Sequence, residues 1–355
     1  MGRMMSPASP RRILVIGPSW VGDMVMAQTL FAELKRQCPD HAIDVLAPAW
    51  SRPILQRMPE VREALSLPFE HGDLRLGERR QMGRSLAGHY DQAIVLPNSL
   101  KSALVPFWGR IALRTGWRGE LRYGLLNDVR VLDKQRYPLM VQRFVALALA
   151  PDAPPPEKDA IAAPQLRVDT SKADATLQAL GLKKNLPVLA LCPGAEFGPS
   201  KRWPEAHYAA VAADWISQGR QVWLFGSDKD RPVAEWIRDQ IPENQRARAQ
   251  VLAGHTSLEE AVDLLSLADL VVSNDSGLMH IAAALRRPLV AIYGSTSPDF
   301  TPPLHDQVEI VRLGLDCSPC FQRECPLGHL NCLRQLAPSL VQQAMTRLLQ
   351  EGGQA

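Results

Sequence analysis

The sequence predicts an α/β protein of doubly wound parallel sheets, arranged in two domains. Short apolar runs alternate with segments of helical spacing almost from end to end. A strand that is apolar throughout has to be buried on both faces, which is typical of parallel sheets covered by helices. The runs predicted as strands are 12–17, 42–47, 91–97, 186–194, 220–226, 268–275 and 287–294.

Helices are predicted after these runs, because apolar residues recur there every three or four positions. The segment 24–34 has one such face, and the segment 278–285 has another. The segment 258–265 has a third, and it follows a capping box formed by Ser257 and Glu260.

The pattern is interrupted at 149–164, where proline and charged residues replace the periodicity. This composition is typical of a linker. We therefore predict two similar domains, 1–160 and 161–355, with a cleft between them and a C-terminal helix in the second. Ligands of open α/β sheets bind beyond the carboxyl ends of the strands, so the loops after the strands are where a site is expected.

The composition is that of a globular enzyme, with 46% hydrophobic and 22% charged residues in 355. No uninterrupted apolar run reaches the roughly 18 residues of a transmembrane helix. The opening "MGRMMSPASPRR" is basic and lacks the apolar stretch of a signal peptide, so we expect a cytoplasmic protein, and residues 1–10 are expected to be disordered. Residues 1–165 hold 22 Lys/Arg against 16 Asp/Glu, and the remainder holds 18 against 21. This asymmetry indicates either an acidic partner for the first domain or a solvated basic surface.

The loop "GPSWVGD" follows the first predicted strand. Gly17 and Gly22 occupy the outer positions of a dinucleotide fingerprint, but Ser19 stands where the middle glycine is needed. The carboxylate of Asp23 would repel a phosphate. Asp23 either stabilises the helix start by its negative charge, or it accepts a proton from a substrate hydroxyl.

Two loops of the second domain have features of a phosphate site. In "CPGAEFGPSKRWPEAHY", Pro204 suits the first helical position, which puts Lys201 just before a helix. In "SNDSGLMHIAAAL", Asp275 or Ser276 can cap a helix, and Gly277 lets its first turn approach a ligand closely. A solvated Lys-Arg pair and a capped buried helix are the alternatives. Taken together, two glycine-bearing helix starts in one domain predict a cradle for a nucleotide diphosphate.

Basic residues of the first domain are clustered along the chain. A smaller acidic ligand suits them better than nucleic acid does, because aromatic residues are thinly interleaved and the pI is only about 8.5. The clusters are Arg75, Arg79, Arg80 and Arg84, then Arg110, Arg114, Arg118, Arg122 and Arg130.

Four cysteines lie close together near the C-terminus, at Cys317, Cys320, Cys325 and Cys332. We call residues 317–332 the cysteine segment. In a cytoplasmic chain this density favours a structural zinc site over disulfides. Only one Cys-x-x-Cys pair is present, so free thiols or a redox pair stay open, and His329 could replace one thiol. The other cysteines, Cys38 and Cys192, are interpreted as packing residues.

Several long stretches resemble the ADP-heptose-dependent heptosyltransferases of lipopolysaccharide core biosynthesis. They include "ILVIGPSWVGDMVMAQTL", "LAPAWSRPILQRMPEV", "VLPNSLKSALVPF", "RTGWRGELRYGLLNDVRVLD", "CPGAEFGPSKRWP" and "SNDSGLMHIAAALRRPLVAIYGSTSPDFTPPL". The resemblance covers residues 11–312 and leaves the cysteine segment outside.

The resemblance implies a glycosyltransferase-B architecture of two Rossmann-like domains, the first binding the acceptor and the second ADP-heptose. It also implies that Asp23 is the general base and that Lys201 takes part in catalysis. The expected donor-binding residues are Gly194, Glu196, Lys201, Asp275, Ser276, Gly277 and His280. For the acidic acceptor we expect Arg79, Arg80, Lys101, Arg118 and Arg122.

The implied reaction is metal-independent, inverting transfer of L-glycero-D-manno-heptose from ADP-heptose to the first heptose of heptosyl-Kdo2-lipid A in a Gram-negative bacterium. The expected partners are ADP-heptose, a lipid-linked acidic acceptor and, transiently, the cytoplasmic membrane face, but not nucleic acid. No cofactor is expected beyond the possible structural zinc. The alternatives are transfer of the first or third heptose, a dinucleotide-dependent oxidoreductase or epimerase, and a non-enzymatic nucleotide-sugar-binding module.

Overall fold

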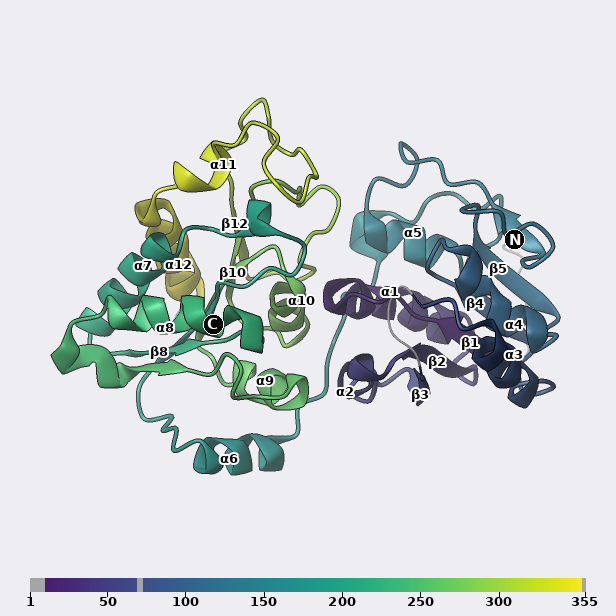
Figure 1. The fold of residues 1–355 in the computed structure, drawn as a ribbon, viewed down its shortest axis with the longest axis horizontal. Coiled ribbons are helices and arrows are strands. Elements are labelled where there is room, and N and C mark those ends of the chain that lie inside the picture. The colour runs from purple at the N-terminus through teal and green to yellow at the C-terminus, as the bar shows by residue number, and fades with distance from the viewer. Residues whose placement is uncertain (1–9, 69–72, 353–355) are drawn as a thin grey trace, which may run out of the picture. The chain divides into compact units, whose positions relative to one another are not determined.

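The computed structural model describes residues 10–68 and 73–352 (Figure 1). The chain divides into two compact units, Met1–Pro164 and Gln165–Ala355, and the first unit ends where the predicted linker ends. The disorder expected for residues 1–10 concerns positions that, apart from residue 10, lie outside the described residues.

The first unit contains a six-stranded parallel sheet in the order β3-β2-β1-β4-β5-β6. Its strands are β1 (Arg12–Ile16), β2 (Ala42–Pro48), β3 (Val61–Leu67), β4 (Gln92–Val95), β5 (Leu113–Trp117) and β6 (Asp128–Arg130). Its helices are α1 (Val21–Gln37), η1 (Ala49–Ser51), α2 (Arg52–Leu55), α3 (Leu76–Ser85), η2 (Leu100–Ala103), α4 (Leu104–Trp108), α5 (Met140–Ala146) and η3 (Lys158–Ala160). Ile13, Leu14 and Val15 of β1 are fully buried, as a strand covered on both faces requires.

The second unit contains another six-stranded parallel sheet, in the order β12-β11-β10-β7-β8-β9. Its strands are β7 (Val188–Cys192), β8 (Gln221–Leu224), β9 (Ala249–Val251), β10 (Leu270–Asn274), β11 (Leu289–Ile292) and β12 (Val308–Val311). Its helices are α6 (Thr170–Ala179), η4 (Pro199–Lys201), α7 (Glu205–Ser217), η5 (Asp228–Asp230), α8 (Arg231–Asp239), η6 (Glu243–Arg248), α9 (Leu258–Leu265), α10 (Gly277–Ala284), α11 (Asn331–Arg334) and α12 (Pro338–Gly352). The fold class predicted from the sequence is confirmed in both units.

All seven predicted strands are present, whereas five further strands were not predicted. Four of these, β3, β6, β9 and β12, are the edges of the two sheets. An edge strand is covered less, so it does not need a continuous apolar run. The fifth, β5, reads "LRTGW" and mixes polar with apolar residues.

The predicted helix starts agree closely with the structure. The capping box at α9 is confirmed, because the Ser257 hydroxyl accepts a hydrogen bond from the Glu260 amide at 3.2 Å. Pro204 is the N-cap of α7 rather than its first helical residue, so this prediction was wrong by one position.

The chain order of the strands defines where each unit can hold a ligand. In the first unit β1 lies between β2 and β4, and in the second β7 lies between β8 and β10. In the first unit β2 and β3 lie on one side of β1, and β4 to β6 lie on the other. In the second unit β8 and β9 lie on one side of β7, and β10 to β12 lie on the other. The positions between β1 and β4 and between β7 and β10 are therefore topological switch points. The loops after β1 and β4, and those after β7 and β10, flank these points.

No helix within residues 10–68 and 73–352 combines the length and the apolar character needed to cross a membrane.

Candidate functional site

A buried ion pair joins the two loops at the switch point of the second unit. Lys201 Nζ lies 2.6 Å from Asp275 Oδ2, and their side chains are 15% and 4% exposed. The Thr296 hydroxyl, from the loop after β11, donates to the same carboxylate oxygen at 2.5 Å. Lys201 also lies over the Phe197 ring, 5.0 Å from its centroid. Because a buried ion pair this well partnered is held firmly, the ammonium group has a defined position.

Asn274, the last residue of β10, ties the same loops together. Its side-chain oxygen accepts from the Trp203 amide at 3.1 Å and from the Tyr208 hydroxyl at 3.0 Å. Its side-chain nitrogen donates to the Pro193 carbonyl at 2.7 Å. These bonds fix both ends of the 193–203 loop to the strand that precedes Asp275.

His280 lies one turn into α10 and is 5% exposed. Burial lowers the pKa of His280 to about 4, and the charges of Asp275 and Lys201 act on this pKa in opposite directions. The imidazole is therefore neutral at pH 7, which excludes it as a cationic phosphate ligand at that pH.

The remaining predicted donor residues have different roles in the local structure. Ser276 is the N-cap of α10, its hydroxyl 3.3 Å from that of Ser273, and Gly277 is the first helical residue. Gly194 lies against the carboxylate of Asp230, and a Cβ at position 194 would lie 2.5 Å from Asp230 Oδ2. Glu196 is exposed and faces Lys229 at 3.4 Å.

In the first unit Asp23 and Lys101 lie at the starts of the helices that follow the two loops of the switch point. Asp23 is the third residue of α1 and is half-buried. Trp20 is the N-cap, so Asp23 stands in the first turn, where the helix dipole favours a negative charge. Lys101 lies in η2, directly after the loop that follows β4, and is also half-buried.

Two of the arginines predicted to bind acceptor are instead buried structural residues. Arg79 is 5% exposed and donates to the carbonyls of Leu74 and Asp73 at 2.7 and 2.9 Å. Arg122 is 2% exposed, donates to the Pro97 carbonyl at 2.6 Å, and also donates to the Trp117 carbonyl. Their guanidinium groups therefore hold loops together and do not present charge at the surface.

Arg80 and Arg118 are exposed, as an acceptor-binding role requires. Arg118 begins a loop that is clamped to the one after β4. The Glu120 carboxylate accepts from the Leu100 amide at 2.7 Å, and a Cβ at Gly119 would lie 2.2 Å from the Asn98 carbonyl. This close approach places Arg118 beside the loop that leads to Lys101.

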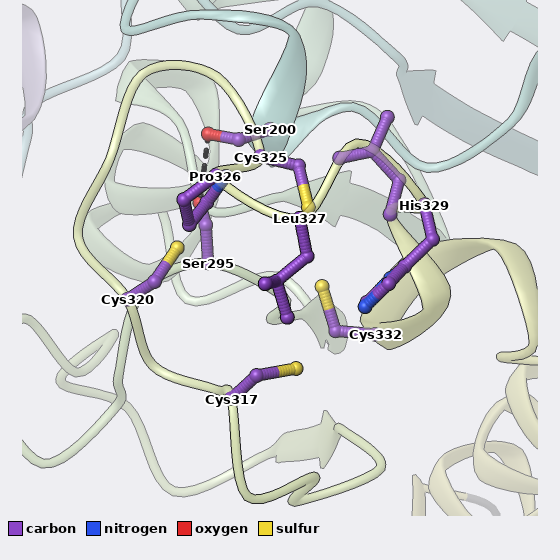
Figure 2. Close-up of a pocket in the computed structure, with 10 residues that line it drawn as sticks. Ser200, Ser295, Cys317, Cys320, Cys325, Pro326, Leu327, His329 and Cys332 are labelled. Atoms are coloured by element: carbon purple, nitrogen blue, oxygen red, sulfur yellow. Dashed lines mark hydrogen bonds between the residues drawn. The ribbon is translucent and has the colours of Figure 1, made fainter.

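The cysteine segment packs against the loops that follow β7 and β11 in the second unit, at Ser200 and Ser295. Figure 2 shows the sulfur atoms of Cys317, Cys320, Cys325 and Cys332 directed toward one small cavity. All four thiols are unpaired by disulfides, as are the buried Cys38 and Cys192. Across the two described stretches, no three His, Cys, Asp or Glu side chains are already grouped tightly enough to hold a metal ion.

The pKa values of two of these thiols depart from the ordinary range. Backbone N–H groups of residues 327–330 lower the pKa of the Cys325 thiol. Burial raises the pKa of Cys332, and the charges of the other three cysteines raise it further. The four sulfurs are therefore close enough to influence one another electrostatically.

Comparison with known proteins shows the family of the chain. The family described as "Glycosyltransferase family 9 (heptosyltransferase)" matches residues 79–331, which is more than half of the chain. The chain belongs to glycosyltransferase family 9. The match includes the loops after β7 and β10, and hence the Lys201–Asp275 pair of this family 9 enzyme.

Similar proteins extend the relationship to nearly the full length of this glycosyltransferase. Lipopolysaccharide heptosyltransferase 2 of Salmonella typhimurium is 50% identical over 96% of this chain and 99% of the relative. The Escherichia coli K12 protein of the same name is 50% identical over 95% of this chain and 98% of its own. A solved structure of E. coli ADP-heptose lipopolysaccharide heptosyltransferase II superposes with a TM-score of 0.87 at 47% identity, covering 96% of this chain and 99% of that one.

Several residues of the site were missed in the sequence. Asn274 directly precedes the predicted Asp275, and Thr296 follows the predicted strand 287–294, so inspection of every strand end would have found them. Asp230 forms a capping box with Ser227, a pattern readable as Ser-x-x-Asp. The role of Ser200, whose hydroxyl contacts the cysteine segment, has no local sequence signal.

Proposed function

We propose that this chain transfers L-glycero-D-manno-heptose from ADP-heptose to the first heptose of the lipopolysaccharide inner core. The observation that carries the proposal is the 50% identity, over nearly the full length, to proteins named lipopolysaccharide heptosyltransferase 2. The buried Lys201–Asp275 pair at the switch point of the second unit agrees with it.

The donor is assigned to the second unit. Lys201 supplies a fixed positive charge, and the amide groups at the start of α10 supply hydrogen-bond donors for the diphosphate. Thr296 and Asn274 keep these groups in place before the donor arrives. Groups that need no rearrangement stabilise the growing charge on ADP most effectively.

The acceptor is assigned to the first unit, with Asp23 as the general base. The acceptor hydroxyl attacks the anomeric carbon as Asp23 removes its proton, and the bond to the ADP oxygen breaks with its electron pair leaving on ADP. Attack from the face opposite ADP inverts the anomeric configuration. In this proposal Lys201 carries the electrostatic stabilisation, so no catalytic metal is needed.

Arg80, Lys101 and Arg118 are assigned to acidic groups of the acceptor. Arg80 and Arg118 are exposed, and the loops of Lys101 and Arg118 contact each other. A lipid-linked acceptor would bring this unit to the cytoplasmic face of the membrane. Arg79 and Arg122 are left out, because their guanidinium groups are buried and bonded.

The decisive experiment compares core acceptors that carry zero, one or two heptoses. Purified protein is incubated with ADP-heptose and each acceptor, and both ADP release and product mass are measured. We expect transfer to the one-heptose acceptor alone. Transfer to the acceptor with no heptose, or to that with two, would reassign the enzyme to another step, and no transfer to any acceptor would reject the proposal. Anomeric analysis of the product tests inversion, and an unchanged rate on adding Mg²⁺ or Mn²⁺ tests metal independence.

A further inference from the structure

We propose that Cys317, Cys320, Cys325 and Cys332 bind one Zn²⁺ ion, and that this zinc site holds the Lys201 loop in position. The inference rests on the proposed function only where donor affinity is measured. The metal site itself can be tested without any activity.

All four thiols line a single cavity of about 20 Å³, close to the size that one water molecule or one ion occupies (Figure 2). His329 also lines it, but His329 Nδ1 already accepts from the Asn331 amide at 3.0 Å. The four sulfurs are therefore the more suitable ligand set. Four thiolates are a ligand set that selects zinc or an iron centre, and zinc is the usual ion of closed structural sites.

Cys325 begins a tight turn beside the cavity. The Gly328 amide donates to the Cys325 carbonyl at 3.0 Å, and Cys325, Pro326, Leu327 and His329 all line the cavity. Since no three ligating side chains in the described residues yet have metal-binding geometry, the ion has to draw the sulfurs inward.

The cysteine segment contacts the residue before Lys201 and the residue before Thr296, whose hydroxyl bonds Asp275. The Ser200 hydroxyl donates to the Gln322 carbonyl at 2.5 Å, and the Ser200 amide donates to the Arg323 carbonyl at 3.2 Å. The Phe321 amide donates to the Ser295 carbonyl at 2.7 Å. Ser200 precedes Lys201, and Ser295 precedes Thr296, which bonds Asp275. A segment cross-linked by zinc would thus hold the two loops that carry Lys201 and Thr296 in position.

The first experiment measures metal content of the full chain. Protein purified under reducing conditions from zinc-supplemented cells should contain one zinc per chain, and its Co²⁺-substituted form should show thiolate-to-cobalt charge transfer and the visible bands of tetrahedral cobalt. Cys320→Ser and Cys325→Ser should lose the metal, whereas Cys38→Ser, at a buried cysteine outside the cluster, should keep it.

Thiol counting supplies a second, independent readout. We expect four of the six cysteines to be protected from a thiol reagent in the metal-loaded protein and to react after chelation. Equal reactivity with and without zinc, cobalt bound in octahedral geometry, or iron at the same stoichiometry would overturn the zinc assignment.

The coupling to Lys201 is tested by Ser200→Ala, which removes the hydroxyl between the two loops. Zinc content should stay at one per chain, while KM for ADP-heptose should rise by about tenfold with a smaller change in kcat. An unchanged KM would reject the positioning role and leave the metal result standing. If transfer activity were missing altogether, ADP binding measured by calorimetry would replace KM, so the failure of each proposal remains distinguishable.

Discussion

Lys201 and Asp275 come from loops that follow two adjacent parallel strands, β7 and β10, and their side chains meet at 2.6 Å. The strand pairing thus brings together residues that are 74 positions apart. Because Asp275 is also bonded by Thr296, the carboxylate is held from two sides and in turn fixes the ammonium group.

Removing both charges of this pair should impair the reaction without unfolding the protein. In Lys201→Met/Asp275→Asn we expect KM for ADP-heptose to rise and kcat to fall, by about 10²- to 10³-fold in kcat/KM, because the charge facing ADP is lost. Lys201→Met alone should also lose about 3–5 kcal/mol of stability, since it leaves a buried carboxylate without its partner.

Steady-state kinetics and denaturant unfolding check both statements. Lys229→Met is the matched control, because Lys229 is 77% exposed and its contact with Glu196 is long. If the double variant matched the wild type in KM and kcat, Lys201 would not belong to the site.

Asp23→Asn should lower kcat by about 10²- to 10⁴-fold, because an amide cannot accept the acceptor's proton. The affinity for ADP-heptose, measured by calorimetry, should stay within a factor of two or so, since the donor is assigned to the other unit. Asp40→Asn, at an exposed position of the same unit, serves as control. A loss of donor affinity instead of turnover would contradict the base assignment.

Acceptor binding should depend on salt if exposed cations contact its acidic groups. We expect the acceptor KM to rise steeply with ionic strength, and this slope to be reduced in Arg80→Gln/Arg118→Gln. Donor KM should respond less. A salt response that is identical in the wild type and the double variant would show that these two arginines lie in solvated surface only.

Replacing Arg122 should lower the free energy of unfolding, whereas replacing Arg118 should not. Arg122→Met leaves the Pro97 and Trp117 carbonyls without their donor in a buried place, and each unsatisfied group costs about 1–3 kcal/mol. Arg122→Lys should restore little, because an ammonium group lacks the planar fork of guanidinium. Chemical denaturation of Arg122→Met, Arg122→Lys and Arg118→Met measures the difference, and equal stability of all three would contradict the bracing role.

His280 should make the protein less stable in acid. Its folded pKa of about 4 lies below the ordinary 6.5, so the unfolded chain binds more protons between these values. The contribution of the neutral imidazole to the free energy of unfolding is complete above pH 6.5 and falls as pH drops toward 4, by up to about 3 kcal/mol. The free energies of unfolding at pH 7 and pH 4.5 should therefore differ less in His280→Asn than in the wild type. The exposed His89→Asn is the control, and an unchanged pH dependence in His280→Asn would refute the prediction.

Most central strands and their loops were predictable because these strands are apolar throughout; β5, which mixes polar with apolar residues, is the exception. That pattern located β1, β7 and β10, and hence the loops with Asp23, Lys201 and Asp275. Edge strands such as β3 and β12 lack this signal, since one side of them is not covered by a neighbouring strand.

The arginine predictions show a different limit. Helical spacing and charge look the same for Arg79, which is buried, and for Arg80, which is exposed. Which of them faces water depends on carbonyl groups brought near by the fold, such as those of Asp73 and Leu74 around Arg79. The sequence pattern therefore could not separate the buried arginine of α3 from the exposed one.

The contact between Gly119 and Asn98 has a consequence for how this enzyme can change over generations. No side chain fits at position 119, because its Cβ would lie 2.2 Å from the Asn98 carbonyl. The neighbours Arg118 and Leu121 are exposed, Leu121 by 79%, whereas the Glu120 carboxylate is held by the Leu100 amide. If this loop binds the acceptor as proposed, relatives that use a differently decorated acceptor should differ at positions 118 and 121 and keep the glycine at position 119.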